Sequence, residues 1–268
     1  MTGGNKGIGY FVVRRLCREF KGDVILTARN EQLGREAVQR LEEEKCNPKF
    51  HQLDITSDDS VERLRAYLEK NYGGLDVLVN NAAVAYKAAS TAPLSEQATV
   101  TIDVNFFGTL RVCSALLPLL RPHARVVHVS SRAGRIGIVS SKELRAKFTS
   151  PDLTEEALCD LMRQFTAAAL EGTRERDGWP TNCYGTSKVG MTALAKIQAR
   201  QFAAGGKEDI LVNACCPGYC KTDMTSQRGG QHPDEGAKTV AHLALLPSGS
   251  PNGEFWGEMQ VIPWDTRL

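Results

Sequence analysis

Several features that would assign this 268-residue chain to a specialised class are missing from its sequence. The formal net charge is only +2, which is too small to indicate a nucleic-acid or anionic-membrane partner. No apolar run approaches the length that spans a bilayer, and residues 1–6 lack the apolar core of a signal peptide. We therefore expect a cytoplasmic protein without membrane or nucleic-acid partners.

The sequence also lacks the spacings of a metal centre or a disulfide framework. Cys215, Cys216 and Cys220 are close together, but they lack zinc-knuckle spacing, and the five histidines show no pairing typical of ligands. The other cysteines are scattered through apolar segments of a chain long enough to form its own core. We expect reduced thiols and no metal site.

Short β-rich runs alternate with helical patterns along the chain. Strands are expected at 23–28, 50–55, 75–80, 125–130 and 210–214, and helices after Asn30, around 61–68, and over 95–120 and 184–202. Leu33, Ala37, Val38 and Leu41 should share the packed face of the helix that Asn30 caps. This alternation predicts an α/β fold with a doubly wound parallel sheet, as one domain over residues 1–268.

A glycine-rich loop opens the chain and leads into an apolar helix. Its candidate ligand-binding residues are Gly3, Asn5, Lys6, Gly7, Ile8 and Gly9. The glycines let the backbone turn tightly and approach a diphosphate at the helix N-terminus. No Gly-Lys-Ser/Thr closes the loop, so it is not a Walker A motif. A purely structural glycine turn is the alternative.

Arg29 follows the first expected strand, where sites for NAD place an acid that binds the ribose hydroxyls. A guanidinium at this position suits a 2′-phosphate, and Lys6 adds a second cation. The pair favours NADP(H) over NAD(H), the alternative being two solvated surface charges. The missing acid also argues against a methyltransferase that uses S-adenosylmethionine.

Tyr184 and Lys188 are four residues apart within an expected helix, so they lie one turn apart on the same face. An ammonium near a phenol favours the phenolate and lowers the pKa of the tyrosine. Such a pair can exchange a proton with a substrate oxygen near neutral pH. The spacing is common by chance, so it needs support from the rest of the chain.

That support comes from several short motifs in a fixed order. They are Thr2-Gly3-Gly4-Asn5-Lys6-Gly7-Ile8-Gly9, Leu53-Asp54-Ile55, Asn80-Asn81-Ala82-Ala83, Asn105, Val129-Ser130-Ser131, Tyr184-Gly185-Thr186-Ser187-Lys188 and Pro217-Gly218. Together they resemble the short-chain dehydrogenases/reductases nearly end to end, and most of all the NADPH-dependent carbonyl reductases of animals. The resemblance implies a Rossmann-type fold and the reduction of aldehydes, ketones or quinones with NADPH.

The resemblance also implies roles for individual residues. Tyr184 would donate the proton to the carbonyl oxygen, and Lys188 would lower its pKa and hold the nicotinamide ribose. Ser131 would hydrogen-bond the substrate oxygen, and Asn105 would anchor a water that links Lys188 to solvent.

Further positions are expected around the cofactor and the substrate. Asp54, Ile55 and Asn81 would line the cofactor groove, and Cys220, Lys221 and Thr222 would reach the nicotinamide or the diphosphate. Tyr219 would border the substrate pocket, as would Arg132 and Ala133. The physiological substrate does not follow from these residues.

The interval between Ser131 and Tyr184 is unusually long for the family, and we expect a helical insertion over residues 133–180. A helix pattern follows Thr154 and carries Leu158, Leu161, Met162, Phe165 and Ala169. The resemblance implies that this helix covers the face usually used for dimerisation, which gives a monomer.

The two ends of the chain carry two further expectations. The resemblance places a first strand directly before the glycine loop, and Met1 stands where that strand should end. Without that strand, its two neighbours lose hydrogen-bond partners and the glycine loop loses its anchor, so we expect either upstream residues or a poorly stable product. A catalytically silent nucleotide-binding protein is the alternative in the second case. The ending Thr266-Arg267-Leu268 resembles a peptide that a PDZ-type groove accepts.

Overall fold

The computed structural model describes residues 1–265, so the C-terminal motif 266–268 lies outside the described residues. The helices are α1 Gly7–Glu19, α2 Glu31–Glu43, α3 Asp58–Tyr72, α4 Leu94–Ile102, α5 Thr109–Leu116, α6 Lys142–Thr149, α7 Glu155–Leu170, α8 Cys183–Ala204 and α9 Pro233–Ala244. A π-helix, Asp103–Gly108, joins α4 to α5, and single 3₁₀ turns cover Leu117–Leu119, Arg132–Gly134 and Ile136–Ile138.

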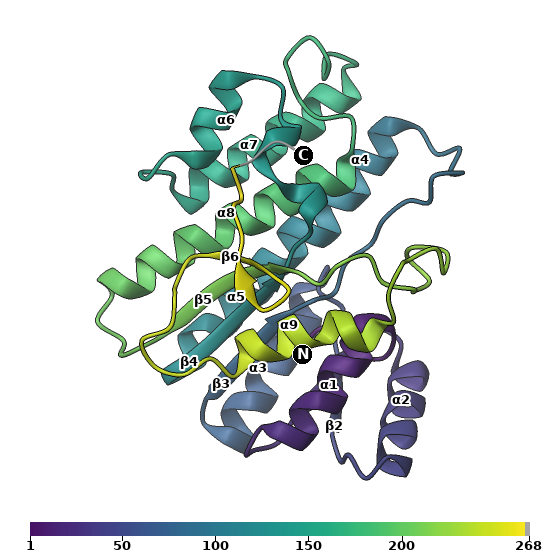
Figure 1. The fold of residues 1–268 in the computed structure, drawn as a ribbon, viewed down its shortest axis with the longest axis vertical. Coiled ribbons are helices and arrows are strands. Elements are labelled where there is room, and N and C mark those ends of the chain that lie inside the picture. Colours follow the sequence, from purple (N-terminus) through teal and green to yellow (C-terminus); the bar gives the residue numbers. More distant parts are fainter. Residues whose placement is uncertain (266–268) are drawn as a thin grey trace.

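The strands are β1 Ile25–Ala28, β2 Lys49–Gln52, β3 Leu75–Asn80, β4 Leu120–Val129, β5 Leu211–Cys216, β6 Phe255–Gly257 and β7 Gln260–Val261. They form two sheets, β1-β2 and β3-β4-β5-β6-β7, in which every pair is parallel except β6-β7. Strand–helix alternation thus produces the expected parallel architecture (Figure 1).

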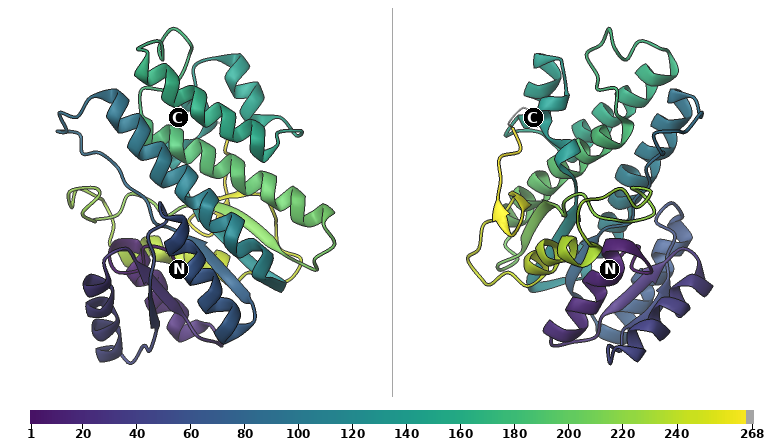
Figure 2. Two further views of the ribbon diagram at one scale, coloured as in Figure 1. Left: turned by 180° about the vertical axis from the view of Figure 1, so that it is seen from behind. Right: turned by 45° about the vertical axis from the view of Figure 1, so that its right-hand side comes forward.

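Two apolar cores lie on opposite faces of the larger sheet, because successive side chains of a strand point to opposite faces. In β4, Val126 belongs to the core with α3, α5, α7 and α8, whereas Val127 belongs to the core with α1, α2 and α9. Helices therefore cover both faces, and Figure 2 shows the long α8 crossing one of them. The prediction of a doubly wound sheet is confirmed.

Met1 and Thr2 connect the two sheets where β1 and β3 face each other. Thr27 N donates to Met1 O over 3.1 Å, and Thr2 N donates to Val79 O over 3.0 Å. Below these contacts lies a hollow of about 80 Å³ between β1 and β3, walled by side chains such as Leu16 and Leu68. Within residues 1–265, no strand of the sheet precedes α1.

The expected elements agree with the observed ones in type, with differences in detail. Asn30 caps α2, since its side chain accepts a hydrogen bond from Leu33 N, and Ala37 and Leu41 are buried. Leu33 was expected on the same face but is 49% exposed, so this part of the prediction is wrong. Gly34 takes the packed position instead, against the ring of Phe50.

The helical stretch Leu94–Leu119 is long and apolar enough to cross a membrane by length and composition alone, contrary to our expectation from the sequence. Half of it is buried inside the protein, where Phe106 and Val112 belong to the core. A core helix of a globular protein passes the same test, so this stretch is weak support for a membrane span.

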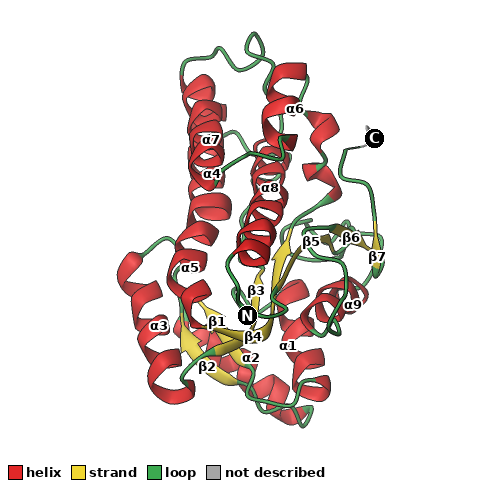
Figure 3. Cartoon of the chain, turned by 90° about the vertical axis from the view of Figure 1, so that its left-hand side faces the viewer, coloured by secondary structure: helices red, strands yellow, loops and turns green. Residues whose placement is uncertain are grey.

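The expected insertion contains α6 and α7. Thr154 caps α7 by accepting a hydrogen bond from Ala157 N over 3.1 Å. All five predicted face residues are buried, and the helix packs against α4 and α8. Figure 3 shows these three helices side by side above the sheet.

Candidate active site

A groove of about 510 Å³ runs along the carboxyl ends of β1–β3, beside the start of α1. Among its lining residues are most of the predicted cofactor positions: Gly3, Asn5, Lys6, Gly7, Ile8, Gly9, Arg29, Asp54, Ile55, Asn81, Lys221 and Thr222. Glycine is required inside this loop, because a Cβ on Gly9 would lie 2.2 Å from Gly3 O. Gly3 and Gly7 both have positive φ, where side chains are strained.

The glycine loop is anchored by Asn81 and Thr2. The Asn81 amide donates to Thr2 O and Gly3 O, both over 3.0 Å, and Thr2 Oγ1 accepts from Asn81 N over 2.9 Å. Gly4 N also donates to Thr27 O over 2.9 Å. The loop therefore keeps an anchor, contrary to the expectation that it would lose one.

Two cations lie on the groove where a 2′-phosphate was predicted to bind. Arg29 follows β1 and is exposed, and Lys6 is the N-cap residue of α1. Lys6 Nζ forms an ion pair of 2.9 Å with Asp223, which belongs to the loop after β5. The backbone amides, the open start of α1 and these cations together suit a phosphorylated dinucleotide.

The four predicted catalytic residues come from three neighbouring elements. Ser131 follows β4, Tyr184 and Lys188 lie on the first turns of α8, and Asn105 belongs to the π-helix. The β4–β5 pairing places Ser130 N beside Cys215 O, and Ser130 Oγ donates to Lys188 O over 3.0 Å. The end of β4 is therefore held directly against the helix that carries Tyr184 and Lys188.

Lys188 is almost fully buried, at 2% exposure, and its ammonium donates to Val129 O over 2.7 Å. Nζ lies 5.4 Å from the centre of the Tyr184 ring. Burial lowers the pKa of Lys188 to about 8, although the nearby Cys215 and Cys216 oppose this shift. A lysine with this pKa changes charge near neutral pH.

Tyr184 behaves differently from the expectation based on spacing alone. Burial raises the pKa of its phenol above the usual value near 10, and a hydrogen bond with Ser131 only partly opposes this effect. No lowering of this pKa by Lys188 is found, so the expected shift is absent in this structure. The phenol is thus held in its protonated form, which is the form that can donate a proton.

Asn105 is completely buried and fixed by three hydrogen bonds. Its amide oxygen accepts from Val84 N over 2.8 Å, and its amide nitrogen donates to Val84 O over 2.9 Å and to Ser187 Oγ over 3.0 Å. The π-helix widens the backbone at this point, a distortion common at functional sites. Asn105 thus joins α8 to the segment that follows Asn81; its role in holding a water stays a prediction.

Two predicted site residues on the loop after β5, Tyr219 and Cys220, do not line the groove. Tyr219 is 61% exposed on the loop after Gly218 and is not among the residues that line the groove, so its contact with a substrate stays a prediction. Cys220 is buried, and its thiol donates to Pro217 O over 3.5 Å, away from the residues that line the groove. The structure therefore separates Cys220 from Lys221 and Thr222.

Gly134, Gly185 and Trp264 support the site in ways that the sequence motifs do not predict. A Cβ on Gly134 would lie 2.5 Å from Lys188 Cβ, and one on Gly185 would lie 2.6 Å from Ala133 O. Trp264 Nε1 donates to Gly134 O over 2.8 Å and fixes the same loop from outside. Gly134 follows the Ser131 motif and Gly185 lies within the Tyr184 motif, but the contacts of both glycines depend on how β4 and α8 pack together.

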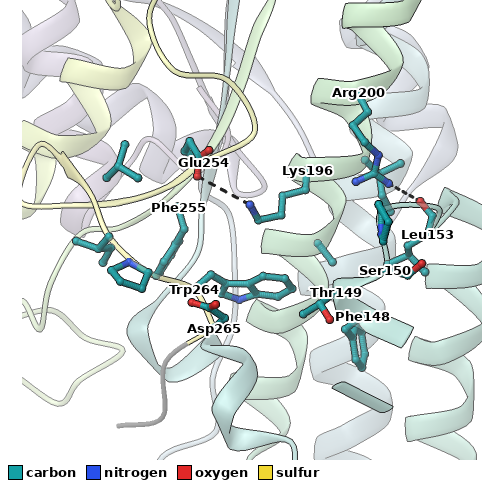
Figure 4. A pocket seen from close by; sticks show the side chains of 16 residues that line it. Phe148, Thr149, Ser150, Leu153, Lys196, Arg200, Glu254, Phe255, Trp264 and Asp265 are labelled. Atoms are coloured by element: carbon teal, nitrogen blue, oxygen red, sulfur yellow. Dashed lines mark hydrogen bonds and ion pairs between the residues drawn. The ribbon is translucent and has the colours of Figure 1, made fainter. Parts of the chain in front are cut away.

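A second hollow, of about 500 Å³, lies against the C-terminal half of α8. Figure 4 shows Lys196 reaching towards Glu254, and Arg200 bound to Leu153 O over 2.6 Å. None of the predicted site residues lines it. We place the candidate active site at the groove and the start of α8.

Comparisons with known proteins agree with this arrangement. Residues 1–160 and 171–232 match the family "short chain dehydrogenase". Carbonyl reductase [NADPH] 1 of Bos taurus is 50% identical over 98% of this chain and 97% of its own length, and that of Homo sapiens is 49% identical with the same coverage.

Solved structures give the same result for the fold. Salutaridine reductase from Papaver somniferum has a TM-score of 0.87 and 30% identity, with 95% of this chain and 97% of that chain covered. Menthone neomenthol reductase from Mentha piperita has a TM-score of 0.81 and 29% identity, with 95% and 96% covered. The chain therefore belongs to the short-chain dehydrogenase/reductase family.

Proposed function

We propose that the protein reduces carbonyl compounds, namely aldehydes, ketones and quinones, with NADPH as the hydride donor. The observation that carries the proposal is that Ser131, Tyr184, Lys188 and Asn105 come together beside a glycine-lined groove whose lining includes Arg29 and Lys6. The carbonyl reductases that are about half identical to this chain bear the same activity in their names.

Each catalytic residue has a task that its surroundings favour. Tyr184, whose protonated form is favoured by its partly buried position, donates its proton to the carbonyl oxygen, while Ser131 binds that oxygen. Lys188 then stabilises the phenolate with its buried ammonium. Asn105 holds the segment around Val84 in register with α8, where a water linking Lys188 to solvent would be placed.

Bound NADPH supplies the hydride, and the chain's own residues bind and orient it. The glycine loop would hold the diphosphate at the start of α1, and Arg29 and Lys6 would bind the 2′-phosphate. Asp54, Ile55, Asn81, Lys221 and Thr222 also line the groove and would contact the bound cofactor.

The proposal extends to the state of the protein. The packing of α7 onto α4 and α8 supports a monomer, because it covers the helices that otherwise remain free to pair. The eight cysteines are free thiols, which suits a reducing cytoplasmic location.

The test is the oxidation of NADPH by the purified protein with a panel of quinones, aldehydes and ketones. We expect turnover with at least one of these classes and a clear preference for NADPH over NADH. Stabilisation by NADPH without turnover on any carbonyl would instead support a silent nucleotide-binding protein.

A further inference from the structure

Asp223 is a charged residue on the groove that has no part in the chemistry described above. Its carboxylate lies 2.9 Å from Lys6 Nζ, and Lys6 holds the pKa of that carboxyl below its usual value. The two residues are far apart in the chain and are both about two-thirds exposed. This pair joins the glycine loop to the loop after β5.

Hydrogen bonds within the loop after β5 fix the backbone on both sides of Asp223. Thr225 Oγ1 donates to Cys220 O over 2.7 Å and accepts from Thr222 N over 3.0 Å, and Gln227 N donates to Thr222 O over 2.9 Å. A Cβ on Gly7 would lie 3.4 Å from Thr222 Cγ2, so this turn lies directly against the glycine loop. Asp223 is therefore part of a defined turn.

Lys6 is also one of only two groove-lining cations that the proposed function assigns to the 2′-phosphate, the other being Arg29. A carboxylate and a phosphate at the same ammonium repel each other, and both draw on the same three N–H donors. The ion pair with Asp223 thus weakens the attraction between Lys6 and a 2′-phosphate. A cofactor without that phosphate does not need Lys6 and should not be affected.

We infer that Asp223 is a specificity-determining residue, which competes with the 2′-phosphate for Lys6 and so reduces the preference for NADP(H) over NAD(H). This inference rests on the proposed function, because it requires that Lys6 binds the 2′-phosphate. Thr222 and Asp223 both line the groove, and the effect proposed for Asp223 is exerted through Lys6.

The experiment is calorimetric titration of NADP⁺ and NAD⁺ into the full chain and four variants: Asp223→Asn, Lys6→Met, the double variant of these two, and Arg29→Met. Exposed ion pairs contribute up to about 1 kcal/mol, so we expect Asp223→Asn to tighten NADP⁺ binding about two- to fivefold. The Kd for NAD⁺ should stay within about a factor of two. In the Lys6→Met background, Asp223→Asn should no longer tighten NADP⁺ binding.

Asp160→Asn is the matched control. Asp160 is an exposed carboxylate on α7, paired with Arg163 over 2.8 Å, and its replacement makes the same change in net charge. It should leave both Kd values unchanged. The effect of Asp223→Asn should also shrink when salt is raised, since the pair is exposed.

The results distinguish a failure of the competition by Asp223 from a failure of the proposed 2′-phosphate site. If Lys6→Met weakens NADP⁺ binding but Asp223→Asn does not tighten it, or weakens it, the competition is refuted and the cofactor assignment stands. Equal tightening of NAD⁺ would also refute the competition. If Lys6→Met and Arg29→Met leave NADP⁺ binding unchanged relative to NAD⁺, the proposed 2′-phosphate site itself is wrong.

Discussion

At the scale of single residues, the site depends on burial more than on a contact between two charges. Spacing alone predicts that Lys188 lowers the pKa of Tyr184, whereas burial dominates both groups in the structure. Burial always disfavours the charged form, so it raises the pKa of the phenol and lowers that of the ammonium. Desolvation therefore sets the pKa of both the proton donor, Tyr184, and the cation that stabilises it, Lys188.

This account predicts how the reaction responds to pH. Lys188, whose pKa is about 8, is an ammonium below that pH and loses its charge above it. Only the charged form stabilises the phenolate left on Tyr184, so kcat for carbonyl reduction should be level below about pH 8. Above it, kcat should fall by about tenfold per pH unit. A pH profile of kcat that stays level through pH 10 would contradict this role.

At the scale of elements, α8 is fixed against the loop that follows Ser131. Gly134 packs so closely against Lys188 that a Cβ on residue 134 would lie 2.5 Å from Lys188 Cβ. Gly134→Ala must push the loop and α8 apart, and we expect a loss of about 1–3 kcal/mol of stability together with a lower kcat.

Gly230→Ala is the control for this substitution, since a Cβ there would meet no atom within 4 Å. Thermal unfolding and kcat should change little in this variant. The expectation fails if Gly134→Ala keeps the thermal midpoint and the turnover of the wild type.

The elements show which parts of the fold could be predicted from sequence. The strand at 75–80 and the start of α8 were placed to within a residue, because turn residues or a polar cap flank an apolar run. The exposed Leu33 was misplaced, since the face of α2 is decided by Phe50 on β2, a contact between segments distant in sequence. The π-helix around Asn105 also leaves no periodic signal in so short a stretch.

The candidate site was predictable for a different reason. Its residues form ordered motifs, so their positions follow from the resemblance, and the structure brings most of them to one edge of the sheet. The motifs do not predict which side chains of a segment face the groove. Lys221 and Thr222 line the groove, whereas the Cys220 thiol contacts Pro217 O instead. Supporting contacts such as Trp264 to Gly134 connect residues 130 positions apart.

At the scale of the whole molecule, the proposal of a monomer rests on the insertion. Because α7 lies on α4 and α8, residues such as Ile102 and Leu194 are already buried within one chain. Light scattering during size-exclusion chromatography should give the monomer mass of 29.3 kDa. A stable dimer mass at micromolar concentration would overturn the proposal of a monomer.

The central claim is that Tyr184 donates the proton during NADPH-dependent carbonyl reduction, and Tyr184→Phe tests it most directly. The variant removes one hydroxyl and keeps the ring, so NADPH affinity should remain within a few-fold of the wild type. The steady-state rate of NADPH oxidation with the best carbonyl substrate should fall by about 10²–10⁴-fold. An unchanged rate, with NADPH still bound, would contradict the account.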